Sequence, residues 1–69
     1  MKLSARNILS GKVVSITKGA TTAHVVVEVG PGQIITSAIT NEAVEELALV
    51  VGQAAKVIVK SSDVIIGVD

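Results

Sequence analysis

The apolar residues of this chain come in short β-branched runs, and this pattern limits the fold more than any other feature. The runs are Val25-Val26-Val27, Ile34-Ile35, Val57-Ile58-Val59 and Val64-Ile65-Ile66. β-Branched side chains favour strands, and glycine or polar turn residues separate the runs. No run approaches the roughly 20 apolar residues that a helix needs to cross a bilayer, and no signal peptide is visible. The sequence therefore predicts an all-β cytoplasmic protein without membrane contact.

The strand and turn signals predict five strands and one short helix. Strands are expected over residues 11–18, 21–29, 33–40, 53–59 and 64–68, and the helix over residues 41–49. Gly30-Pro31-Gly32 is the strongest turn, because glycine accepts a positive φ and proline fixes its own φ. In the second strand, Ala23, Val25, Val27 and Val29 share one face. Residues 1–69 are thus predicted to form a single domain, a small five-stranded OB-like barrel with the helix between strands three and four.

The apolar period changes after the third predicted strand. The residues at helical spacing are Val44, Leu47 and Ala48. Thr40 or Asn41 can serve as the N-cap, since both side chains accept a hydrogen bond from the first helical turn. Glu45 and Glu46 are expected to form the solvated face of this short helix.

Both faces of the predicted strands are apolar. A monomeric small barrel buries only its inner face, so its strands should alternate between apolar and polar residues. The chain is 49% hydrophobic but has no Phe, Tyr or Trp, and it has no spare helices to cover an outer face. Association with a second subunit is the expected solution. The alternative is a monomer whose exposed apolar patch makes it prone to aggregate.

Composition excludes several kinds of site. Six basic and six acidic residues give a net charge of zero, and without aromatic rings a nucleic-acid-binding OB module is not expected. The absence of cysteine excludes disulfides and thiolate metal sites, and the single histidine, His24, cannot hold a metal cation alone. His24 also has no Ser or Asp partner at a recognisable motif spacing, so an enzyme is not expected.

Two polar stretches lie at opposite ends of the sequence: Ser4-Ala5-Arg6-Asn7 and Lys60-Ser61-Ser62-Asp63. If the fold brings them together, the product is two positive charges with two or three hydroxyls, which suits an oxyanion. Arg and Lys beside Ser are more often solvated surface, and the residues alone leave both explanations open.

The segment from Ser4 to Val13 resembles the opening of the molbindins, the small molybdate-binding Mop proteins. The resemblance continues through Lys18-Gly19, Thr22-Ala23, Val25, Ile39-Thr40, Val44-Glu45-Glu46-Leu47 and Val59-Lys60-Ser61-Ser62-Asp63-Val64. It implies an OB-like fold and a homohexamer built as a trimer of dimers. It also implies that molybdate or tungstate binds between subunits, without an organic cofactor, for intracellular molybdenum storage and homeostasis. The alternative is an assembly module of the same fold that does not bind oxyanions.

The resemblance also implies the site residues. One class of pocket takes Ser4, Arg6, Lys60 and Ser61 from one subunit, and Thr40 is carried over as the contribution of a neighbouring subunit. A second class, on a threefold axis, involves the turn of Lys18, Gly19 and Ala20. Three positions depart from the family pattern: Ser62 replaces a common Thr, Ala20 a larger Val, and His24 an acidic residue.

Molybdate and tungstate are tetrahedral dianions with four acceptor oxygens and no donors. Their pocket should contain only donors, with cations to offset dehydration. Asp63 is therefore expected to point away from the ion and to close its own turn. His24 is expected to be a surface or interface residue rather than a ligand. If several copies of it lined an axial pocket instead, its protonation could make anion affinity depend on pH.

Overall fold

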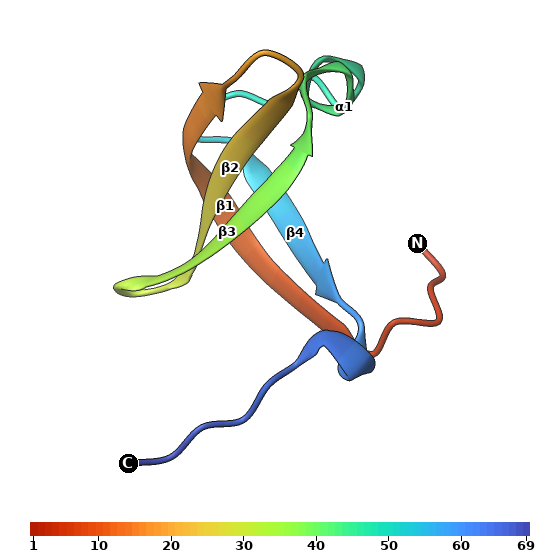
Figure 1. The fold of residues 1–69 in the computed structure, drawn as a ribbon, viewed down its shortest axis with the longest axis vertical. Coiled ribbons are helices and arrows are strands. Elements are labelled where there is room, and N and C mark those ends of the chain that lie inside the picture. Colours follow the sequence, from red (N-terminus) through yellow and green to blue (C-terminus); the bar gives the residue numbers. More distant parts are fainter.

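The computed structural model describes residues 1–69 and contains four strands with one short α-helix. The elements are β1 (Asn7–Lys18), β2 (Thr22–Gly30), β3 (Gln33–Thr40), α1 (Asn41–Glu46), β4 (Ala54–Val59) and the 3-10 turn η1 (Ser61–Asp63). The strands form one antiparallel sheet in the order β3-β2-β1-β4. Figure 1 shows a strongly curved sheet, with α1 at one end and the start of β1 and end of β4 at the other. No helix is long and apolar enough to cross a membrane.

The curvature of the sheet arises along the long strand β1, because this strand pairs with two different neighbours, β4 and β2, along its length. Its first half, from Asn7 to Lys12, pairs with β4, and its second half pairs with β2. A bulge lies between Val13 and Ser15, where a β-strand bends and twists more strongly. A Cβ built at Gly11 would overlap the carbonyl oxygen of Glu28. Only glycine therefore allows β1 and β2 to approach so closely here.

The order of the first four predicted strands and the helix is confirmed, and their boundaries differ by a few residues. The third strand has the predicted bounds, whereas β1 begins at Asn7 instead of residue 11. Thr40 is the N-cap of α1, and its Oγ1 accepts a hydrogen bond from the backbone N–H of Ala43 at 3.0 Å. The predicted turn at residues 30–32 is present, with Gly32 at a φ of 70°.

The helix ends at Glu46, three residues before the predicted end. Ala48 has a φ of 51°, and its N–H donates to the carbonyl of Glu45. The N–H of Leu49 donates to the carbonyl of Val44, so the two bonds form a Schellman motif. The side chains of Val44 and Leu49 pack together in the core, which explains why the chain turns here.

The core lies on the concave face of the sheet. Its buried residues are Val13, Ala23, Val25, Val27 and Val44. The predicted inner face of the second strand is thus confirmed, with Val29 partly buried against the same cluster. Between the free edges of β3 and β4 an apolar groove of about 340 Å³ remains open.

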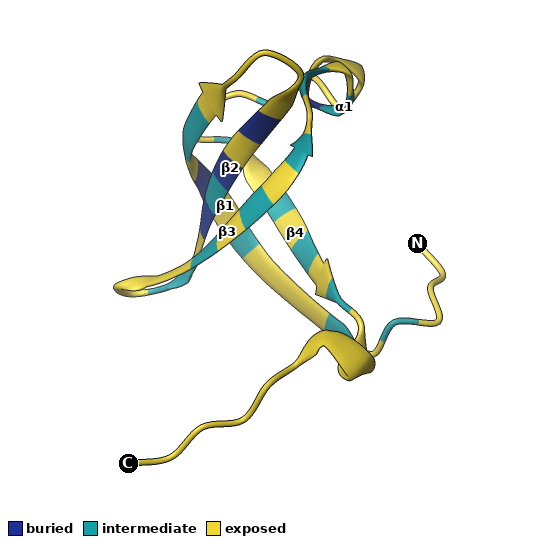
Figure 2. Ribbon diagram, in the orientation of Figure 1, coloured by how far each residue is buried: buried dark blue, intermediate teal, exposed yellow.

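The predicted fifth strand over residues 64–68 is not formed, and the sheet does not close into a barrel. The chain leaves η1 in a direction away from the sheet, so this segment reaches neither free edge (Figure 1). Ile65, Ile66 and Val68 are 92%, 83% and 95% exposed, and the whole segment is exposed in Figure 2. The single chain is therefore an open four-stranded sheet with an uncovered apolar C-terminal segment.

Candidate functional site

The pairing of β1 with β4 brings the two polar stretches of the sequence together. Asn7 lies opposite Val59, and its Nδ2 donates to the Val59 carbonyl at 3.2 Å. Arg6 precedes this pair and Lys60 follows it, so the antiparallel register places them next to one another. The expected meeting of the two stretches is therefore present in the fold.

A tight turn after β4 presents the second polar stretch. Lys60 precedes η1 in an extended conformation, and its carbonyl accepts a hydrogen bond from the N–H of Asp63 at 2.9 Å. Backbone groups close this turn, and the carboxylate of Asp63 forms no hydrogen bond, which differs from the expectation that it closes its own turn. Ser61 lies within the turn and is exposed.

The four residues of the first predicted site, Ser4, Arg6, Lys60 and Ser61, are all exposed in the single chain. The structure contains one ion pair, and it lies elsewhere, between Lys18 and Glu45. Arg6 and Lys60 therefore keep their positive charges unpaired on the two segments that also carry Ser4 and Ser61. Such a set offers only hydrogen-bond donors and cations, which suits an anion. No group of three His, Cys, Asp or Glu side chains could hold a metal ion.

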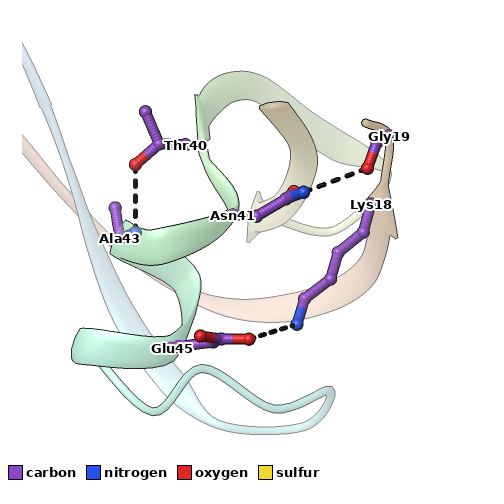
Figure 3. Close-up of polar contacts among 6 residues, drawn as sticks. All are labelled: Lys18, Gly19, Thr40, Asn41, Ala43 and Glu45. Atoms are coloured by element: carbon purple, nitrogen blue, oxygen red, sulfur yellow. Dashed lines mark hydrogen bonds and ion pairs between the residues drawn. The ribbon is translucent and has the colours of Figure 1, made fainter. Parts of the chain in front are cut away.

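Thr40 lies at the opposite end of the molecule from this first site. It pairs with Thr22 in the sheet, and its neighbour Asn41 donates through Nδ2 to the carbonyl of Gly19 at 3.0 Å (Figure 3). β1 joins the two ends over 12 residues, and a strand of this length, at about 3.3 Å per residue, is long enough to span the 35 Å length of the molecule. Thr40 therefore cannot reach the first site of its own chain.

The second predicted site forms a compact corner of the molecule, made of the β1–β2 turn and α1. Figure 3 shows Lys18 beside Glu45, with Nζ and Oε1 3.4 Å apart. Glu45 is exposed, as expected for the solvated face of the helix, and its contact with Lys18 was not predicted. Sequence reasoning also missed Asn41, whose backbone N–H donates to Thr21 at 2.9 Å. Asn41 and Glu45 are four residues apart, and this helical spacing was the available signal.

Neither His24 nor the open groove adds donors to the first site. His24 is exposed on β2, opposite Thr17 and Ala38, and its effect on anion affinity stays a prediction. The groove between β3 and β4 is lined mostly by apolar side chains, including Ile35, Val57 and Leu49. It is suited to an apolar segment of protein.

Comparisons with known proteins agree with this architecture. The profile of the TOBE domain matches residues 3–66. A probable molybdenum-pterin-binding protein of Haemophilus influenzae is 46% identical over 69 residues, which is the full length of both chains. MopII of Clostridium pasteurianum, solved in an apo form, superposes with a TM-score of 0.89 at 48% identity, covering 97% of this chain and all of that one.

A third relative was solved with its ligand. The cytoplasmic molybdate-binding protein ModG, with molybdate bound, gives a TM-score of 0.94 at 48% identity, and the match covers all of this chain and 49% of that one. Full-length identity near one half, the matching domain profile and the shared fold all agree. The chain therefore belongs to the TOBE-domain family and, within it, to the molbindins, or Mop proteins.

Proposed function

We propose that this chain is a single-domain cytoplasmic protein that binds molybdate, and also tungstate, between the subunits of a homo-oligomer. Its role would be molybdenum storage and homeostasis rather than catalysis. The observation that carries this proposal is the β1–β4 register, which brings Arg6 and Lys60, neither of them in an ion pair, to the same end of the sheet. The relatives described as molybdate-binding or molybdenum-pterin-binding proteins support the choice of ligand.

The chemistry of the four site residues matches a tetrahedral dianion. The Arg6 guanidinium offers a planar fork of donors, Lys60 a mobile ammonium, and Ser4 and Ser61 rotatable hydroxyls. The two positive charges balance the two negative charges of the ion. No organic cofactor or metal cation is needed for this type of binding.

Exposure of these residues supports a site that is completed by a second subunit. In the single chain all four are open to solvent, where charge-assisted hydrogen bonds are screened by water. A neighbouring subunit would exclude that water and add a hydroxyl. Thr40 is the proposed contribution, since it lies at the end of the molecule opposite to the first site of the same chain.

The apolar C-terminal segment supports a homo-oligomer and suggests how two copies join. Exposure of Ile65, Ile66 and Val68 forgoes about 1.5–3 kcal/mol for each side chain that burial would recover. The groove between β3 and β4 has free strand edges and an apolar lining. Residues 64–69 of a second copy would add a strand there, as in other β-augmented complexes. A homohexamer, arranged as a trimer of dimers, is the proposed final assembly.

Native mass spectrometry with molybdate, tungstate or sulfate tests the proposal directly. The expected result is a hexamer that gains molybdate or tungstate in discrete steps and does not gain sulfate. Arg6→Ala should weaken molybdate binding by about ten- to a hundredfold, the worth of one charge-assisted contact, while the hexamer persists. Lys12→Ala is the matched control, because it removes an exposed cation from the middle of β1.

Two results would contradict the proposal. A hexamer that binds no oxyanion would favour an assembly module without a ligand. A monomer that remains soluble would remove the proposed site between subunits.

A further inference from the structure

The corner that contains Lys18 carries its own competing anion. Glu45 Oε1 lies 3.4 Å from Lys18 Nζ, in the only ion pair of the structure. We propose that Glu45 acts as an internal competitor that occupies Lys18 and so keeps the second pocket weak for oxyanions. This inference rests on the proposed function, because it concerns the second pocket of the same molybdate-binding protein.

The fold holds the two partners in position through Asn41. Its backbone N–H donates to Thr21 at 2.9 Å and its Nδ2 donates to Gly19 at 3.0 Å, so α1 is fixed to the turn after β1. Glu45 lies one helical turn after Asn41 on the same side of α1. Its carboxylate is consequently carried to the ammonium of Lys18 by the same contacts that fix the turn, as Figure 3 shows.

Without Glu45, the corner would offer a set of donors suited to an anion. The N–H of Gly19 is used by Thr22 at 2.8 Å, but the N–H groups of Ala20 and Thr21 have no partner in the chain. Successive free backbone N–H groups are one kind of feature that binds anions, and Lys18 is the residue from which this turn starts. The carboxylate of Glu45 binds the ammonium of Lys18, so an incoming oxyanion has to displace this carboxylate before it can use the ammonium.

Glu45 is expected to lower the oxyanion affinity of the corner only slightly, because the side chains of Lys18 and Glu45 are both exposed. The side chains of Lys18 and Glu45 are 46% and 71% exposed, and exposed ion pairs contribute little. Removal of the carboxylate should therefore tighten anion binding at the corner by about two- to fivefold. Glu42 and Glu46 lie on the same helix, are exposed like Glu45, and are not paired with Lys18.

The experiment uses the full-length protein with Arg6→Ala, so that binding at the corner is measured after the first site has been weakened. Molybdate is titrated by calorimetry into Arg6→Ala, Arg6→Ala/Glu45→Gln and Arg6→Ala/Glu46→Gln. Both glutamine variants remove one negative charge from α1, but only Glu45→Gln releases Lys18. The expected result is about two- to fivefold tighter binding with Glu45→Gln and less than half of that gain with Glu46→Gln. Lys18→Ala should abolish the gain.

Equal gains from the two glutamine variants would overturn the proposal, since only the overall charge would then matter. No measurable molybdate binding in Arg6→Ala/Glu45→Gln at millimolar concentrations would also overturn it, because releasing Lys18 would have created no site. Failure of the proposed function gives a different result, namely equal molybdate binding by the unmodified protein and Arg6→Ala. Unfolding temperatures measured without molybdate show whether each variant keeps its fold.

Discussion

The two ends of β1 present lysine in opposite electrostatic settings. At the start of β1, Lys60 lies beside a second cation, Arg6, and neither forms an ion pair. At the other end, Lys18 is held by Glu45, and two further carboxylates lie on the same helix. The comparison teaches that lysines at the two ends of one strand differ in whether their charge is already compensated within the chain.

Gly11→Ala is expected to have the largest effect, because it disturbs the strand that joins the two ends. The new Cβ would overlap the Glu28 carbonyl oxygen, and backbone cannot move aside cheaply. We expect a loss of about 3 kcal/mol or more in the free energy of unfolding, measured by urea denaturation. Gly67→Ala is the control, since a Cβ there has no neighbour within 4 Å and should change stability by less than about 0.5 kcal/mol. Equal stabilities would show that β1 and β2 are less tightly apposed.

Lys60→Ala tests the end of the molecule at the start of β1, where the lysine forms no ion pair. Loss of a charge-assisted contact should weaken molybdate binding by about tenfold or more, with little change in stability because Lys60 is exposed. Calorimetric titration measures the affinity, and Lys12→Ala controls for the lost charge. Similar losses in both variants would indicate that general attraction, and not a site at this end, carries the binding.

Thr40→Asp tests whether the two ends meet across a subunit boundary. Aspartate preserves the N-cap of α1, so the unfolding temperature should stay within a few degrees. If Thr40 contributes to a neighbour's first site, the new carboxylate should weaken molybdate binding by about tenfold through repulsion. Thr40→Ser keeps both the cap and the hydroxyl and should bind as before. An unchanged affinity for Thr40→Asp would place Thr40 away from that site.

Ala48→Gly should have the smallest effect and should leave both ends unchanged. Ala48 has a φ of 51°, a conformation that glycine adopts without the steric cost of a Cβ. The substitution is expected to stabilise the chain by about 1 kcal/mol, measured by thermal unfolding, with unaltered molybdate affinity. Destabilisation would mean that the Schellman motif after α1 depends on alanine for another reason.

Local chemistry accounts for most of the fold that could be predicted. The Gly30-Pro31-Gly32 turn and the alternating inner face of β2 were correctly predicted, because turn residues and side-chain period act within a few residues of one another. The end of α1 was wrong, since no glycine marked it. Ala48 takes the left-handed conformation there because Val44 and Leu49 pack in the core.

The candidate site also divides into features that local chemistry predicts and features that depend on distant contacts. The types of residue in Ser4-Ala5-Arg6-Asn7 and Lys60-Ser61-Ser62-Asp63 suit an oxyanion, but the residues alone favoured a solvated surface, and only the family resemblance favoured a binding site. The pair of Lys18 with Glu45 was not predicted, because it joins a turn and a helix 27 residues apart. Such long-range contacts depend on how α1 docks on the sheet.

The sequence by itself determined the β-rich character of the chain, the order of its elements and the donor chemistry at its two ends. These properties follow from side-chain shape, backbone preference and charge, which each residue carries with it. Tertiary structure decided that Arg6 and Lys60 reach the same end of the sheet, that Glu45 pairs with Lys18, and that residues 64–69 leave the sheet uncovered. These outcomes depend on strand register and on the direction of the chain after η1, which no single segment encodes.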